Sequence, residues 1–449
     1  MDDEAAMSCD QAQNPSVNRR LPLLAMTSLL VCLGVYSRLM TLAALSCAVL
    51  LLLTSPEEEL STLFFLLPFS PVFKLSDGGM SLLTLLVAAF CVVRVVREGR
   101  VSAWAGALMA LAAFLVINGS MANRGRCVDV LLGAALVLTV YSTDACEVSY
   151  DGLLTAFSLG IALSCCFALL SANTGLFPGL VSQTDLSVYD QAEFERFRGL
   201  YSNSNYFSAD ISMALSGLLT LFCMRSRLSA FQWLLACALL CFGVMSASLS
   251  FLLTLSVILV FAVMYLFQTT PRYAFLLLLA MLTTAAAVFL LLRGNVYSAM
   301  WTRLSDLLGA DDASTATTGR SELWKTYAEY LASHLRTLFL GDGLNAPNLG
   351  SADRGAHNTF LEALYYLGIV GAGLFTAVLW MPFRARWAGR RRKFYVYLPL
   401  LTLLIRAFAV SLLTVNNLYF YVIFSFQALR LAERRPTSRV GSCRRTADG

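Results

Sequence analysis

The chain has 449 residues, of which 58% are hydrophobic and 14% are charged, with a mean hydropathy of +0.68 and a formal net charge of +5. Soluble globular chains are nearer half apolar and a quarter charged, so this composition excludes an ordinary soluble domain. The excess positive charge follows the pattern of a membrane topology signal and gives no indication of nucleic-acid binding.

The apolar residues fall into blocks of about 16–22 residues, the length that crosses a hydrocarbon core about 30 Å thick at about 1.5 Å per residue. Inside lipid every backbone group must be satisfied within its own segment, so the blocks are expected to be α-helices. The sequence therefore predicts an all-α, polytopic integral membrane protein with about 12–14 transmembrane helices. The predicted spans are 21–36, 39–54, 60–76, 79–96, 102–118, 127–141, 152–171, 206–224, 229–246, 249–267, 273–292, 357–381, 394–413 and 416–432.

Two long polar loops divide these spans into three groups. The first apolar stretch lacks a small-residue cleavage site, so we expect it to remain as a span rather than to be removed as a signal segment. The predicted divisions are an N-terminal tail (1–20), N-terminal helices (21–171), a first large loop (172–205), central helices (206–292), a second large loop (293–356), C-terminal helices (357–432) and a tail (433–449).

The distribution of lysine and arginine predicts which way the helices run. With the N-terminus in the cytoplasm, 20 of the 33 Lys and Arg residues fall on the cytoplasmic side and 12 on the other. The basic block 384–393 is the strongest single anchor. Since cytoplasmic loops carry the excess of Lys and Arg, both tails are expected in the cytoplasm and both large loops outside it.

The end of the first large loop carries Arg196 and Arg198 just before a predicted span. Arginine suits phosphate, because its planar fork donates two parallel hydrogen bonds to an oxyanion. The competing interpretation is that these are interfacial arginines paired with Glu193 or Glu195.

The second large loop is predicted to contain an amphipathic helix. Trp324, Tyr327, Leu331 and Leu335 recur at helical spacing after Arg320, and Gly341 is a plausible stop. Such a helix is expected to lie against the membrane or over the bundle.

One of the two histidines, His357, stands at the entrance of the next span. Thr359 and Glu362 fit a capping box, which would place His357 just outside a helix N-terminus, where anions are attracted. The competing interpretation is an ordinary interfacial polar residue. Arg406 lies inside an apolar span, where a charged side chain needs a polar partner. Arg406 is expected either to have a structural role or to line a polar cavity.

The sequence contains no recognisable metal-binding or nucleotide-binding motif. The twelve cysteines form no C-x-x-C pair and most lie in apolar runs, so neither a metal site nor a disulfide is expected. The absence of a Walker or Rossmann glycine pattern disfavours an ATP-driven pump.

Three stretches in order on one membrane face resemble the O-antigen ligase and O-antigen polymerase superfamily of bacterial envelope enzymes. They are RGLYSNSNY at 198–206, GRSELW at 319–324, and GDG at 341–343 followed by HNTFLE at 357–362 and GIVG at 368–371. The resemblance covers roughly residues 195–385. Ser204 stands where the family commonly has proline, and ligases and polymerases share the signature, so the subfamily stays open.

The resemblance implies a GT-C-like glycosyltransferase in the bacterial cytoplasmic membrane that works at the outer face without a metal or other cofactor. The implied donor is a glycan on undecaprenyl pyrophosphate, and the implied acceptor is a hydroxyl of a lipid or cell-wall glycan. His357, Arg320 and Arg198 would be catalytic, with the arginines on the pyrophosphate and His357 on the acceptor proton or a phosphate. Substrate-binding roles would fall to Arg196, Asn358, Glu362 and Arg406.

Two other functions stay open. A polysaccharide polymerase of the O-antigen or capsule type would extend the glycan with the same chemistry, and it becomes the better choice if the source has no outer membrane. A transporter or lipid flippase is disfavoured, because such folds often contain inverted repeats and broken helices at mid-membrane, whereas here the polar groups gather at one face. Composition and motifs indicate no oligomeric state.

Overall fold

A computed structural model describes residues 15–54, 58–75, 80–98, 104–142, 149–177, 180, 196–269, 320–345, 355–384, 393–413 and 415–431. Over these residues the chain forms α-helices and short 3₁₀ helices and contains no strand, so the predicted all-α class is confirmed for this part of the protein. The predicted span 273–292, most of the basic block, residues 1–14 of the N-terminal tail and the whole C-terminal tail lie outside the described residues.

The first half of the chain provides helices that follow the predicted spans. They are α2 (Pro15–Leu33), α3 (Arg38–Thr54), α4 (Glu59–Leu66) continued by η1 (Leu67–Phe69), α5 (Leu82–Glu98), α6 (Trp104–Ile117), η2 (Ser120–Ala122), α7 (Arg124–Ser142) and α8 (Tyr150–Thr174). The second half provides α9 (Ser204–Arg225), α10 (Ala230–Met245), α11 (Leu249–Thr269), α15 (Arg320–Ser333), α16 (Leu335–Leu340), α17 (Thr359–Arg384), η4 (Phe394–Tyr397), α18 (Leu398–Ala409) and α19 (Asn417–Leu431).

Within the described ranges five helices are long and apolar enough to cross a membrane. They are α7, α8, α9, α11 and the Thr359–Trp380 part of α17. Shorter apolar helices occupy most of the other predicted spans. The boundaries differ in three places: α2 begins at Pro15, the predicted span 60–76 is α4 and η1 followed by a turn at 70–72, and the predicted span 394–413 already ends at Ala409.

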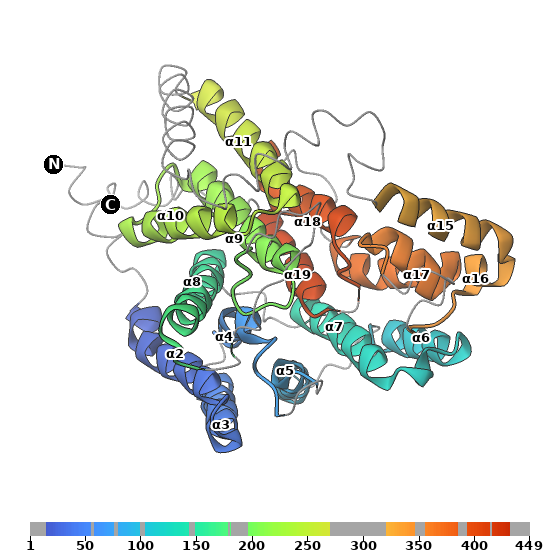
Figure 1. Cartoon of the computed structure of the whole chain (residues 1–449), viewed down its shortest axis with the longest axis horizontal. Helices are drawn as coiled ribbons and strands as arrows, with labels where there is room; N and C mark the ends of the chain where they lie inside the picture. The colour runs from blue at the N-terminus through green and yellow to red at the C-terminus, as the bar shows by residue number, and fades with distance from the viewer. Residues whose placement is uncertain are drawn as a thin grey trace, which may run out of the picture.

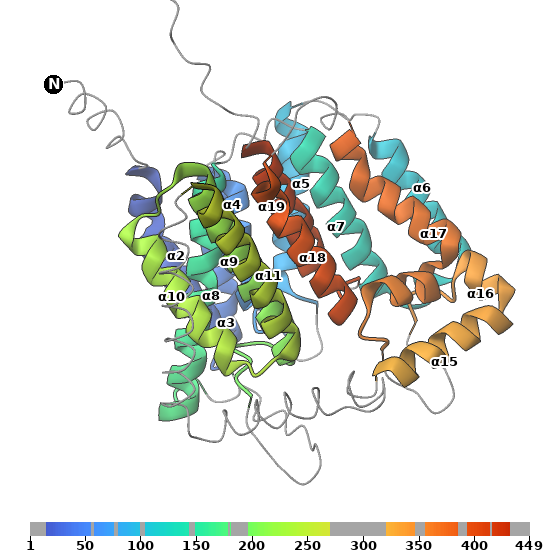
Figure 2. The same cartoon turned by 90° about the horizontal axis from the view of Figure 1, so that it is seen from above.

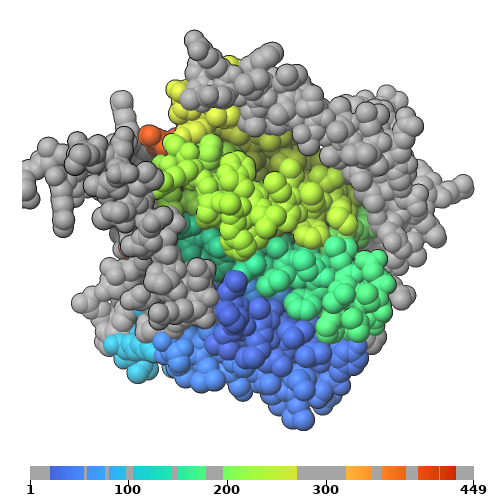
Figure 3. Space-filling view, turned by 90° about the vertical axis from the view of Figure 1, so that its left-hand side faces the viewer, coloured from blue at the N-terminus to red at the C-terminus, as the bar shows by residue number. Residues whose placement is uncertain are grey.

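The long helices run side by side as a bundle (Figures 1 and 2). α18 packs against α9, α11 and α19, while α19 also packs against α7. On one face α2 lies beside α3 and α8, and α8 lies beside α10 (Figure 3). Leu39, Leu50 and Leu234 are exposed on these helices, as expected for side chains that face lipid rather than water.

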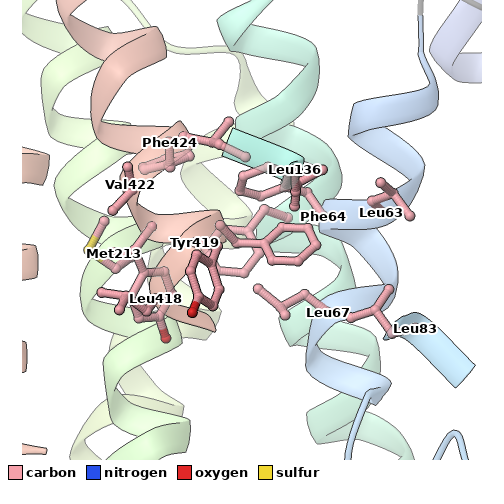
Figure 4. Close-up of a cluster of buried hydrophobic side chains, with 14 of the residues drawn as sticks. Leu63, Phe64, Leu67, Leu83, Leu136, Met213, Leu418, Tyr419, Val422 and Phe424 are labelled. Atoms are coloured by element: carbon pink, nitrogen blue, oxygen red, sulfur yellow. The ribbon is translucent and has the colours of Figure 1, made fainter. Parts of the chain in front are cut away.

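The centre of the bundle is α19, in which every residue from 417 to 429 is buried. A helix that is buried all round lies in a core rather than at a surface. Phe424 and Tyr419 of α19 meet Phe64 of α4, Leu136 of α7 and Met213 of α9 (Figure 4).

A sharp kink at Gly368 turns α17 and lets α16 pack closely on it. Gly368 has φ 64° and ψ −178°, a backbone conformation that is essentially restricted to glycine. A Cβ on Gly368 would lie 2.4 Å from the carbonyl carbon of Phe339 and 2.5 Å from the amide nitrogen of Gly341. The backbone of α17 therefore packs directly against the backbone at the end of α16. Gly341 ends α16 with φ 77°, which confirms the predicted stop.

We expect Gly368→Ala to destabilise the protein by more than the roughly 1–3 kcal/mol of backbone strain alone, because the new methyl group also meets backbone atoms. Gly373→Ala is the matched control in the same helix, since a Cβ there has no neighbour within 4 Å. Thermal unfolding of the purified protein in detergent measures both. Equal midpoints for the two variants would contradict this explanation of the kink.

Candidate functional site

The predicted site residues gather at one end of the bundle, called here the loop end, which comprises residues 118–126, 196–205, 245–250, 320–345, 355–362 and 409–413. Figure 2 shows α15 and α16 at this end, beside the first half of α17. In its middle lies the α18–α19 break, residues 409–413, which begins with the carbonyl of the last residue of α18. Val410 and Leu412 are buried there, so their non-helical backbone needs partners from the protein.

Side chains from three separate parts of the sequence supply those partners. The Arg320 Nη1 atom at the start of α15 donates to the carbonyl of Ala409 at 3.1 Å. The Tyr206 hydroxyl of α9 donates to the carbonyl of Ser411 at 2.8 Å. The third partner, Thr359 of α17, donates to the carbonyl of Val410 at 2.6 Å and accepts from the amide of Leu412 at 2.9 Å. The three stretches that carry the family resemblance therefore meet at the α18–α19 break.

The first turns of α15 fix where Arg320 stands. Trp324 donates from its indole nitrogen to the carbonyl of Ala356 at 2.9 Å, and its ring meets Phe408 edge-on at 5.1 Å. Since Ala356 precedes His357, this bond ties the Arg320 helix to the histidine. The predicted amphipathic helix is shorter than expected: it ends at Ser333, and Leu335 begins α16 with its side chain exposed.

Arg406 is fully buried in α18 and connects three helices. Its guanidinium donates to the hydroxyl of Ser250 in α11 at 2.8 Å and to the hydroxyl of Ser208 in α9 at 2.7 Å. It also donates to the carbonyl of Asn205, while its Nε atom has no hydrogen-bond partner. The Arg320 guanidinium lies close enough for the two positive charges to repel. Arg406 therefore has a structural role and also adds positive charge beside Arg320.

The segment before α9 is held by both of its arginines. The Nε atom of Arg196 donates to the carbonyl of Ser246 at 3.2 Å, which fastens the segment to the turn between α10 and α11. Arg198 is buried, and its Nη1 atom donates to the carbonyl of Ser202 at 3.0 Å. Their proposed pairing partners Glu193 and Glu195 lie outside the described residues.

The start of α17 differs from the predicted capping box. The side chain of Asn358, not that of Thr359, caps the helix by accepting from the amides of Phe360 at 3.0 Å and Leu361 at 3.2 Å. Thr359 is instead bonded to the α18–α19 break, because that buried backbone competes for its hydroxyl. His357 still stands just outside the helix N-terminus, and its φ of 49° is left-handed.

Glu362 is 3% exposed, and its carboxylate faces protein donors. The hydroxyl of Ser411 donates to it, and the backbone of Ala356 and of His357 lies nearby. Glu362 thus links α17, the α18–α19 break and the residues that lead into His357. Asn358 is 3% exposed too, so both side chains act inside the protein in this structure.

A second polar cluster in the bundle was not predicted. Asp210 of α9 is fully buried and accepts hydrogen bonds from Tyr201, Tyr421 and Asn417, the last at 2.8 Å. Burial raises the pKa of Tyr201, so its phenol stays protonated and donates to Asp210. Because the amide of Tyr201 bonds the carbonyl of Arg198 at 3.1 Å, the cluster anchors the turn that carries Arg198.

The glycine-rich turn after α16 is also fixed from outside its own segment. The amide of Asp342 donates to the carbonyl of Tyr365 at 2.8 Å. Arg126 of α7 donates to the carbonyls of Leu344 at 3.3 Å and Asn345 at 3.2 Å. Arg126 was not predicted as a site residue, because only the folded chain brings α7 to this turn.

Comparison with known proteins identified no relatives: no protein-family model and no curated protein matches the chain. The chemistry of the loop end is therefore the basis for assigning a function. It combines buried or half-buried guanidinium groups, the imidazole of His357 and the N-termini of α15 and α17. Such a set can stabilise an anion and exchange a proton.

We expect Arg406→Ala to lower stability by at least about 1–3 kcal/mol, because it leaves buried acceptors of α9 and α11 without their donor. Arg336→Ala is the control, since Arg336 is exposed on α16. Thermal unfolding in detergent distinguishes them. An Arg406→Ala protein as stable as the Arg336→Ala protein would contradict the structural role of Arg406.

Proposed function

We propose that this protein is an O-antigen ligase-like membrane glycosyltransferase. It moves a glycan from undecaprenyl pyrophosphate to an acceptor hydroxyl at the outer face of the bacterial cytoplasmic membrane, and it does so without a metal. The proposed architecture is GT-C-like, with 12–14 spans and both termini in the cytoplasm. The observation that carries the proposal is the meeting of Arg320, Tyr206 and Thr359, one from each resembling stretch, at the α18–α19 break.

The positive charges of the loop end support a pyrophosphate partner. Arg320 bonds the last carbonyl of α18 and Arg406 lies one turn earlier in the same helix, so both positive charges attract an anion bound beside Arg320. Preorganised donors at developing negative charge typically contribute about 2.7–4 kcal/mol each by analogy with oxyanion holes. In this proposal Arg320 and Arg198 stabilise the pyrophosphate leaving group, with Arg196 and Arg406 in support.

The reaction has one bond to form and one to break. The acceptor oxygen bonds the anomeric carbon of the donor glycan, and the bond from that carbon to the phosphate oxygen breaks. Undecaprenyl pyrophosphate leaves with the electron pair. His357 takes the acceptor proton, a contribution of roughly 10²–10⁴-fold for a well-placed base.

Arg320→Ala and His357→Ala should each abolish transfer while the protein stays folded in the membrane, because each removes a group that acts on the reacting atoms. Transfer is measured with purified protein and a lipid-linked glycan donor. Arg336→Ala and His334→Asn are the matched controls, since both side chains are exposed on α16 or at its start. Full activity in both test variants would contradict the assignment.

The glycans attached to undecaprenyl carrier in a deletion strain, resolved by size, distinguish the functions. We expect long polymer stranded on the carrier, because a ligase acts on finished glycan. Single repeat units with no polymer would instead indicate a polymerase with the same chemistry. A profile identical to that of the parent strain would overturn the glycosyltransferase proposal and favour a transporter.

A further inference from the structure

His357 has a backbone conformation that needs support. Its φ of 49° lies in the left-handed region, and it has a Cβ. A residue with a Cβ in a sparsely populated backbone region is strained and persists only where its surroundings fix it. The contacts around residues 355–362 supply that fixation.

Two contacts fix the chain on either side of His357. The indole of Trp324 holds the carbonyl of Ala356 before it. The side chain of Asn358 caps α17 after it, and the carbonyl of Asn358 accepts from the amide of Glu362 at 3.0 Å. The direction of the Cα–Cβ bond of His357 follows from its left-handed backbone conformation.

Glu362 is the side chain that holds this backbone. The backbone of Ala356 and of His357 lies within reach of its carboxylate. Gly355 lies directly against the carboxylate, since a Cβ there would be 2.9 Å from Oε1 of Glu362 and 3.6 Å from Oγ of Ser411. The carboxylate is thus enclosed by the residues that lead into His357.

Ser411 in turn fixes Glu362 from the α18–α19 break. Its hydroxyl donates to the carboxylate, and its carbonyl accepts from Tyr206. Thr359 holds the residues on both sides of Ser411. A path of direct contacts therefore runs from α9 and α18 through Ser411 and Glu362 to the His357 backbone.

We propose that Glu362 and Ser411 are positioning residues that hold His357 in its left-handed conformation and so aim its imidazole. The expected effect on kcat rests on the proposed function. In this inference Glu362 contacts the backbone before His357, whereas the sequence predicted that it contacts the substrate. Among the described residues, the titratable groups that influence Glu362 or are influenced by it are Arg126, Tyr206, Tyr327 and Tyr366.

The two histidines of the chain make a direct test possible. His334 is exposed and stacks on Tyr330 at 4.1 Å, away from the contacts around His357. A His334→Asn background leaves His357 as the single histidine. Its rate of modification by diethyl pyrocarbonate as a function of pH then reports on the His357 imidazole alone, without any need for transfer activity.

In that background Ser411→Ala and Glu362→Gln should change the modification rate and its pH midpoint. In the transfer assay they should lower kcat on the order of 10- to 100-fold with little change in KM, because the base is misplaced while substrate contacts remain. Ser411→Thr retains the hydroxyl and should restore both values. The control Ser216→Ala removes a buried serine hydroxyl within α9 and should leave both unchanged.

Unchanged His357 modification and unchanged kcat in folded Ser411→Ala and Glu362→Gln proteins would overturn the inference. If the Ser411→Ala protein does not fold, Glu362→Gln provides the test, because glutamine has nearly the same side-chain volume as glutamate. If the His334→Asn protein shows no transfer but Ser411→Ala still shifts His357 modification, the proposed function fails and the positioning role stands.

Discussion

The structure of the loop end depends on one constraint: the α18–α19 break is non-helical backbone enclosed by other helices, and its carbonyl and amide groups must find hydrogen bonds. Unpaired polar backbone is costly in a buried, poorly hydrated place, and more so at membrane depth. Arg320, Tyr206 and Thr359 provide the bonds through side chains. Satisfying this one short segment therefore draws together residues more than 200 positions apart in the chain.

The same constraint explains why structural and candidate catalytic groups are adjacent. Arg320 bonds the carbonyl that ends α18, and Arg406 on the same helix ties α18 to α9 and α11. Each arginine thus helps to fix the fold and also adds positive charge to the loop end. Ionisable residues inside a membrane bundle are expected to face its interior and to find polar partners, as Arg406 does.

Hydropathy predicted most helices well, because membrane helices are long apolar runs whose ends are marked by polar residues. Gly341 ended a helix as predicted, for a local reason. The kink at Gly368 and the role of Asn358 as cap were not predicted, since each depends on a neighbour distant in sequence. The break at Ser333, which leaves Leu335 exposed, was also missed, although the apolar spacing continues across it.

The sequence predicted those site residues whose type is unusual in a membrane helix. Arg320, Arg406 and His357 stood out because charge or an imidazole next to apolar sequence is unusual. Ser411, Tyr206 and Asp210 did not, because serine and tyrosine are common in membrane helices and a single aspartate has no periodic signal. Their importance comes from hydrogen bonds between helices, which one sequence does not record.

The most direct measurement of the central claim is the release of undecaprenyl pyrophosphate by the purified protein in lipid nanodiscs, with a lipid-linked glycan donor, an acceptor glycan and a chelator. The account predicts that released carrier and extended acceptor appear in equal amounts and that the chelator has no effect. Protein that is folded but releases no carrier from any lipid-linked glycan tested would contradict it.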